Sequence, residues 1–183
     1  MKSNLEANPW EIKNTQKVYA NNWIEVSHHE VINPAGQDGI YGVVDFKNLA
    51  IGIIPLDENN HTWIVGQYRF PVEKYSWEMP EGGGQIGVDP LHSAQRELLE
   101  ECGIIAKDWE LILEMDLSNS ATTEHAILYV ARELSFTQAQ PEETEELQLR
   151  KIPFEELFQM VMRGEVCDAM TIAAVLKLKL LIA

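Results

Sequence analysis

Four charged residues crowd six positions near the middle of this chain. Arg96 and Glu97 come first, and Glu100 and Glu101 follow after two leucines. Because residues four apart are neighbours on a helix, Glu97 and Glu101 would lie side by side there, and Arg96 would pair with Glu100. Neighbouring carboxylates repel one another, and carboxylate oxygens are good ligands for Mg²⁺. The pattern therefore indicates either a solvated helix face with an ion pair or a site for a hard divalent metal.

A glycine cluster just before this helix favours the metal interpretation. Residues 80–84 read Pro-Glu-Gly-Gly-Gly, which predicts a turn whose backbone approaches a ligand closely. Asp89 is a good N-cap, Pro90 suits the first helical position, and Gly103 is the expected end of the helix. A glycine-rich turn followed by metal-binding carboxylates suggests diphosphate chemistry, in which a metal neutralises phosphate oxygens and activates water.

Composition limits the class of protein. A chain of 183 residues with 45% hydrophobic content suits one domain, or a domain with a small extension. A formal net charge of −15 argues against a nucleic acid or an anionic membrane as the main partner. Cys102 and Cys167 form no zinc motif and are expected to be reduced thiols. The sequence contains no signal-peptide core and no membrane-spanning run, so we expect a cytoplasmic protein.

Most of the remaining chain is predicted to form strands. Short β-branched or alternating runs between turn residues predict strands over residues 17–19, 23–32, 41–46, 50–55, 62–68, 76–80, 109–116, 126–133 and 147–152. Two further helices are predicted over residues 154–163 and 169–181, and Asp168 would cap the second. Many strands with a few helices indicate an α+β fold.

The stretch from Gly82 to Ile104 resembles the signature of the Nudix family. That signature reads G-x5-E-x7-R-E-U-x-E-E-x-G-U, where U is a bulky apolar residue. The chain matches every fixed position except one, because Val88 stands where the family has a glutamate. Three further segments resemble the branch of ADP-ribose and nucleotide-sugar pyrophosphatases: residues 66–70, 77–80 and 163–169.

The resemblance covers nearly the whole chain and implies both a fold and a reaction. The fold would be an α/β/α sandwich around a mixed sheet, formed by residues 46–183. Residues 1–45 would form an N-terminal antiparallel strand region that exchanges across a homodimer. The reaction would be the Mg²⁺-dependent hydrolysis of a nucleoside diphosphate sugar of the ADP-ribose or GDP-mannose type. The products would be a nucleoside monophosphate and a sugar phosphate.

The resemblance also implies a metal site built around the charged helix. Glu97 and Glu101 would be ligands of Mg²⁺, with Mn²⁺ as an alternative cation, and Glu100 would lie close by. The main-chain carbonyl of Glu81 would be a further ligand. Arg96 would orient the glutamates, as hydrogen-bonding groups around a metal site commonly do.

Other catalytic and binding roles are implied for residues outside the helix. The acidic segment at residues 142–146 is either a solvated loop or the source of the general base, and the resemblance favours Glu143 as the base and Glu145 as an extra metal ligand. Such a loop would close over the substrate and exclude water. Arg69 would contact the diphosphate, since a guanidinium matches phosphate geometry, and Glu78 would contact a ribose hydroxyl.

Val88 is the departure that leaves two interpretations open. In the first, the enzyme works with metal held by Glu97, Glu101 and Glu145. In the second, the affinity for Mg²⁺ is so reduced that the domain binds a nucleotide sugar without efficient turnover. We favour activity, because the rest of the signature and the acidic segment are intact.

Overall fold

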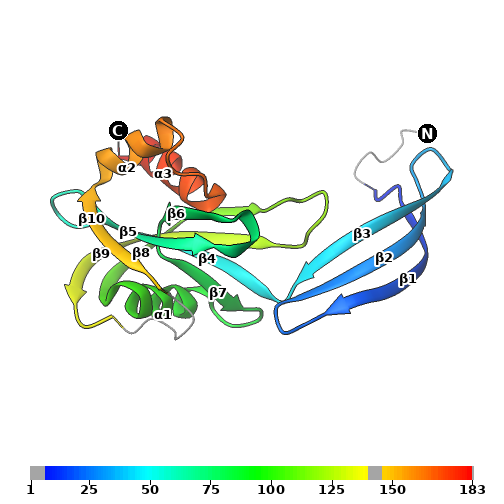
Figure 1. Ribbon diagram of the computed structural model, residues 1–183, viewed down its shortest axis with the longest axis horizontal. Coiled ribbons are helices and arrows are strands. Elements are labelled where there is room, and N and C mark those ends of the chain that lie inside the picture. Colours follow the sequence, from blue (N-terminus) through cyan, green and yellow to red (C-terminus); the bar gives the residue numbers. More distant parts are fainter. Residues whose placement is uncertain (1–6, 140–145, 183) are drawn as a thin grey trace. The chain divides into compact units, whose positions relative to one another are not determined.

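The structure is a computed structural model that describes residues 7–139 and 146–182 (Figure 1). Over this part of the chain it contains ten strands, three α-helices and one short 3₁₀ helix. The chain divides into two compact units. The first unit runs to Lys47 and also includes residues 116–124, and the second unit holds the rest.

The first unit is built on a three-stranded antiparallel sheet in the order β1-β2-β3. The strands are β1 (Glu11–Ala20), β2 (Ile24–Ile32) and β3 (Asp38–Phe46). A turn joins the first two strands, and its Asn21 side chain accepts hydrogen bonds from the backbone amides of Trp23 and Ile24. Such a turn suits asparagine, because its side chain reaches backbone groups two and three residues on.

This sheet has little core of its own. Every residue of β1 is exposed, and in all three strands only Ser27 and Val31 are buried. Apolar side chains stand on its surface, with Ile12 at 61% and Ile40 at 72% exposure. A sheet is normally stabilised by burying one apolar face. The exposed residues therefore mark a surface on which another element could pack.

The second unit contains a four-stranded mixed sheet in the order β7-β4-β9-β8. Its members are β4 (Asn48–Pro55), β7 (Glu81–Gln85), β8 (Ile104–Asp116) and β9 (His125–Phe136). β4 runs parallel to β9 and antiparallel to β7. A second sheet has the order β10-β5-β6, formed by β5 (His61–Arg69), β6 (Lys74–Glu78) and β10 (Gln148–Pro153). The 3₁₀ helix η1 (Phe70–Val72) connects β5 to β6.

Helices cover both faces of the mixed sheet, as Figure 1 shows. Helix α1 (Pro90–Cys102) contacts β4, β5 and β7, while α3 (Ala169–Leu181) contacts β4, β9 and α2 (Phe154–Met162). Ile51 and Ile53 of β4 pack in one core with Leu98 of α1. This arrangement confirms the predicted α/β/α sandwich. Among the described residues, no helix is long and apolar enough to cross a membrane.

The caps of α1 are as predicted, but the glycine cluster is not a turn. Asp89 accepts a hydrogen bond from the backbone amide of Leu91, and Gly103 adopts the left-handed conformation with φ of 64°. Residues 81–85 form strand β7, in which Gly82, Gly83 and Gly84 pair with β4. The prediction of a turn was wrong, because these glycines allow the strand to pack closely against α1 and do not bend the chain. The turn lies further on, where Gly87 has φ of 86°.

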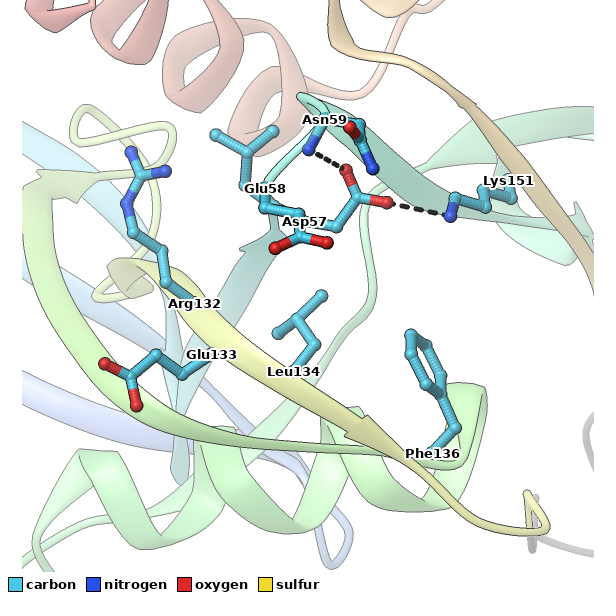
Figure 2. A pocket seen from close by; sticks show the side chains of 9 residues that line it. Asp57, Glu58, Asn59, Arg132, Glu133, Leu134, Phe136 and Lys151 are labelled. Atoms are coloured by element: carbon cyan, nitrogen blue, oxygen red, sulfur yellow. Dashed lines mark hydrogen bonds and ion pairs between the residues drawn. The ribbon is translucent and has the colours of Figure 1, made fainter.

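A cavity of about 580 Å³ lies beside the turn between β4 and β5 (Figure 2). Asp57 organises this turn, because its carboxylate accepts hydrogen bonds from the backbone amides of Asn59 and His61 at 2.9 and 2.8 Å. The same carboxylate pairs with Lys151 of β10 at 2.8 Å. None of the predicted site residues that the structure describes lines this cavity. It is therefore separate from the charged helix.

Candidate active site

Helix α1 places two buried carboxylates against strand β7. Glu97 and Glu101 expose only 8% and 4% of their surface. A Cβ atom added to Gly82 would overlap the Glu97 carboxylate, so this position of β7 has no room for a side chain. One step earlier, the backbone amide of Glu81 donates a hydrogen bond of 3.0 Å to Oε2 of Glu101. The structure thus brings the two predicted metal ligands together beside the backbone of the predicted third.

Arg96 ties these carboxylates to the sheet. Its guanidinium donates to Oε1 of Glu97 at 2.6 Å, to Oε2 of Glu100 at 2.7 Å, and to the carbonyl oxygen of Gly83 at 2.8 Å. Burial lowers the pKa of Arg96, but the negative charges of Glu97 and Glu100 raise it overall. Arg96 is therefore charged, and it fixes the orientation of Glu97 while offsetting part of the cost of burying that carboxylate.

The donor set fits a hard divalent cation. Two carboxylates from one turn of α1 converge on a backbone position that a Cβ atom would fill, and oxygen ligands of this kind suit Mg²⁺ or Mn²⁺. Glu97 and Glu101 would hold the ion.

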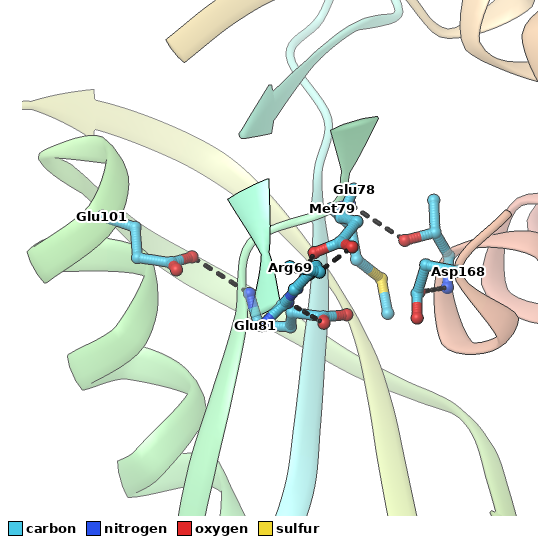
Figure 3. A network of polar contacts seen from close by, with 7 residues as sticks. Arg69, Glu78, Met79, Glu81, Glu101 and Asp168 are labelled. Carbon is cyan, nitrogen blue, oxygen red and sulfur yellow. Dashed lines mark hydrogen bonds and ion pairs between the residues drawn. The ribbon is translucent and has the colours of Figure 1, made fainter. Parts of the chain in front are cut away.

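The predicted substrate residues Arg69 and Glu78 form an ion pair (Figure 3). Nε of Arg69 donates to both oxygens of Glu78, at 3.1 and 2.9 Å, and a second guanidinium nitrogen donates to Oε2, so the contact is bidentate. A second nitrogen of Arg69 contacts Oε1 of Glu81 at 2.5 Å. Glu78 is buried and Arg69 is partly exposed. The structure therefore brings both residues to one place, and their contacts with a substrate stay a prediction.

Two carboxylates near this pair were missed by the sequence reasoning. The first is the side chain of Glu81, for which only the main-chain carbonyl was considered, and the second is Asp168, considered only as a helix cap. Carboxylate oxygens of Glu78, Glu81 and Asp168 lie within 4.8 Å of one another. Burial raises the pKa of the Glu81 carboxyl well above its ordinary value, and the charges of Asp168 and Glu78 add to this rise. Side chains alternate between the two faces of a strand, and Gly82 faces α1. The side chain of Glu81 therefore points to the opposite face, and this alternation was the signal that could have revealed it.

Val88 lies beside Arg96. It is 40% exposed and lines a pocket of about 360 Å³, which also includes Gly83, His92 and Arg96. Glu97 and Glu101 are not among the described residues that line this pocket. A glutamate at position 88 would therefore share this pocket with Arg96. Glu143 and Glu145, the predicted base and extra ligand, lie outside the described residues, and their roles stay predictions.

Comparisons with known proteins agree with this geometry. Residues 46–171 match the NUDIX domain, and residues 10–44 match the nucleoside diphosphate sugar hydrolase N-terminal domain. The chain therefore belongs to the Nudix family, as the resemblance predicted. The fold is also that of a solved ADP compounds hydrolase, with a TM-score of 0.83 at 20% identity over 93% of this chain and 92% of the other.

Three named relatives are similar in sequence to this chain. An ADP-ribose pyrophosphatase of Mycobacterium tuberculosis is 32% identical over 69% of this chain, and the match spans 63% of that protein. A methanol dehydrogenase activator of Bacillus methanolicus is 30% identical over 91% of this chain and 90% of its own length. An ADP-ribose pyrophosphatase of Bacillus subtilis is 27% identical, with 90% of each chain covered. The family match and the two relatives named ADP-ribose pyrophosphatase support the predicted class of enzyme, a pyrophosphohydrolase.

Proposed function

We propose that this protein hydrolyses the diphosphate bond of a nucleoside diphosphate sugar of the ADP-ribose or GDP-mannose type, with Mg²⁺ or Mn²⁺ as cofactor. The observation that carries the proposal is the pair of buried carboxylates, Glu97 and Glu101, packed against Gly82. The N-terminal domain match supports the choice of substrate class. The names of two relatives, both ADP-ribose pyrophosphatases, support ADP-ribose in particular.

The residues divide the work of the reaction between them. When bound, the metal ion neutralises the phosphate oxygens and lowers the pKa of water. Glu97, Glu101 and the carbonyl oxygen of Glu81 would hold this ion, and Glu100 and Glu145 would lie nearby. Arg96 keeps Glu97 in its orientation through the 2.6 Å contact. Because burial of a charged group is costly unless it is paired, this contact also offsets part of the cost of burying the Glu97 carboxylate.

The substrate and the water are handled by a second group of residues. In the proposal, Arg69 binds the diphosphate, Glu78 reaches a ribose hydroxyl, and Glu143 takes a proton from the attacking water. The oxygen of that water bonds to one phosphorus, and the bond from this phosphorus to the bridging oxygen breaks. The products are the nucleoside monophosphate and the sugar phosphate.

A substrate panel tests this function. The full chain is incubated with Mg²⁺ and, separately, ADP-ribose, GDP-mannose and related compounds, and the nucleoside monophosphate is measured. Glu101→Gln is expected to lower the rate at least about a hundredfold, because it removes the charge of a metal ligand. Glu110→Gln, at an exposed position of β8, is the matched control and should keep full activity. Absence of turnover on every compound by the folded protein would refute the proposal.

We further propose that residues 1–45 form a homodimer interface and that residues 46–183 form the catalytic domain. Exposed apolar residues on the β1–β3 sheet support this, among them Ile12, Val18 and Ile40. Val18→Glu is expected to shift the protein from dimer to monomer in analytical ultracentrifugation. Leu111→Glu, which also places a charge at an exposed apolar position, should leave the dimer intact. A wild-type protein that sediments as a monomer at all concentrations would exclude the interface.

The proposed setting of this enzyme is the cytoplasm, and neither nucleic acid nor membrane is proposed as a partner. The net charge of −15 supports the absence of these two partners, since it repels phosphate backbones and anionic headgroups. The substrate is anionic as well, and we propose that the metal and Arg69 overcome this repulsion locally.

A further inference from the structure

Strand β7 separates two groups of carboxylates. Gly82 faces α1, where the Glu97 carboxylate occupies the space that a Cβ atom would take. Because successive residues of a strand point to opposite faces, the side chain of Glu81 points the other way. There it meets Glu78 of β6 and Asp168 at the start of α3, as Figure 3 shows. This second group shares no side chain with the proposed catalytic metal site.

The second group is negatively charged and held in place by the fold. One guanidinium, that of Arg69, faces three carboxylates. Asp168 is fixed because its Oδ2 caps α3 by accepting from the amide of Thr171 at 2.6 Å. The buried hydroxyl of Thr171 in turn accepts a hydrogen bond of 3.0 Å from the amide of Met79. The start of α3 is thereby anchored between Glu78 and Glu81.

One oxygen in this group lacks the partner that its burial calls for. Oε2 of Glu81 is completely buried and accepts no hydrogen bond from the described residues, although Oε1 contacts Arg69. The whole side chain exposes 12% of its surface. Buried carboxylate oxygens in proteins nearly always have a partner, and an ion is one of the few explanations for an exception. This oxygen is an observation independent of the clustering of charges.

We propose that Glu78, Glu81 and Asp168 bind a hard divalent cation at a second site, distinct from that of Glu97 and Glu101. Opposite oxygen ligands of one ion lie about 4 Å apart around Mg²⁺ and about 5 Å apart around Ca²⁺. The three carboxylate oxygens all lie within 4.8 Å of one another, so they are close enough to bind one ion. The cation shares Glu78 and Glu81 with Arg69, because each carboxylate oxygen has more than one lone pair. Its binding needs no substrate turnover, so it does not depend on the proposed activity.

Mn²⁺ binding to the full chain tests this site. The variant that combines Glu97→Gln with Glu101→Gln removes the charges of the proposed catalytic site, and free Mn²⁺ is followed by electron paramagnetic resonance. One bound Mn²⁺ per chain is expected to remain, and Ca²⁺ should displace it. Adding Asp168→Asn should weaken this binding at least about tenfold, because asparagine loses the charge but still caps a helix. Glu165→Gln, an exposed acid just before Asp168, is the matched control and should change the affinity less than about twofold.

A second variant protects the test against misfolding. If circular dichroism shows that Asp168→Asn unfolds the protein, Glu78→Gln takes its place with the same expected loss. The proposal is overturned if the variant without the α1 carboxylates binds no Mn²⁺. It is equally overturned if the remaining Mn²⁺ binds with unchanged affinity after Asp168→Asn or Glu78→Gln. Either result would mean that no metal ion is held by this group.

Discussion

The two units of the molecule treat their side chains in opposite ways. In β4, the last five residues are all buried, whereas in β1 all ten are exposed. The second unit also buries the charges of Glu78, Glu97 and Glu101, while the strands of the first unit bury no charged side chain. A buried charge is costly and persists only where surrounding groups hold it in place. The difference shows that the second unit has enough core to hold buried carboxylates in place. The first unit instead exposes apolar residues on which another element could pack.

Replacing a buried isoleucine should give the largest difference between the units. Ile53→Ala in β4 should lower the free energy of unfolding by about 2–5 kcal/mol, because it leaves a cavity in a fully buried position. Ile12→Ala in β1 should lower it by less than about 0.5 kcal/mol when measured in the Val18→Glu variant, which is expected to be monomeric. Urea unfolding measures both. Equal losses would mean that the first unit has a core within one chain.

Replacing a glycine in β7 should lower the rate of hydrolysis only where the added methyl group meets the Glu97 carboxylate. Gly82→Ala is expected to lower the rate roughly a hundredfold, because its methyl group overlaps the Glu97 carboxylate and displaces it. Gly83→Ala is the matched control, since its methyl group would meet only the Asn48 side chain at 3.7 Å. Steady-state hydrolysis and Mn²⁺ affinity are measured for both. Similar rates for the two variants would contradict the position assigned to Glu97.

Two aspartates that pair with lysines should respond differently. Asp57→Asn should lower the free energy of unfolding by about 1–2 kcal/mol, because it removes the charge that pairs with Lys151 and weakens the hydrogen bonds from two backbone amides. Asp38→Asn removes an exposed pair with Lys13 and should leave the melting temperature unchanged. Thermal unfolding of both variants decides this. If both variants lose the same stability, the greater burial of Asp57 does not make its ion pair stronger than that of Asp38.

The effect of Asp57 should also depend on pH. Burial raises the pKa of Asp57, but the hydrogen bonds from Lys151, His61 and Asn59 lower it overall. A carboxyl group with a lowered folded pKa stabilises the protein above its ordinary pKa of about 4 and loses this contribution as the pH falls through the folded value. The difference between wild type and Asp57→Asn should therefore be full at pH 7 and shrink below about pH 4.

Val88→Glu should give the smallest effect. Val88 is exposed, and Arg96, which lines the same pocket, already pairs with Glu97, Glu100 and the Gly83 carbonyl oxygen. We expect kcat/KM to change less than about fivefold, which is about 1 kcal/mol. Val88→Gln is the neutral control. A gain of more than tenfold for glutamate alone would mean that the wild-type site is short of a carboxylate.

Local rules predicted much of the fold and part of the site. Asp89 and Gly103 marked both ends of α1, and helical spacing placed Glu97 beside Glu101 and Arg96 beside Glu100. These features depend on residues close in the chain. Asp168 is about ninety residues from Glu78, so only the packing of α3 brings them together. The strand at residues 81–85 was missed for the same reason, because its partner β4 and its covering helix give these glycines their role.

The three glycines of β7 leave this strand unable to set its own alignment. A one-residue slip along β4 would exchange the faces of the strand, yet glycine has no side chain to resist it. The alignment is fixed instead by α1, because Arg96 holds the carbonyl oxygen of Gly83 and Glu101 holds the amide of Glu81. The helix that carries the proposed metal ligands is therefore also the template on which β7 folds. In refolding, β7 should become protected from hydrogen exchange only once α1 has docked.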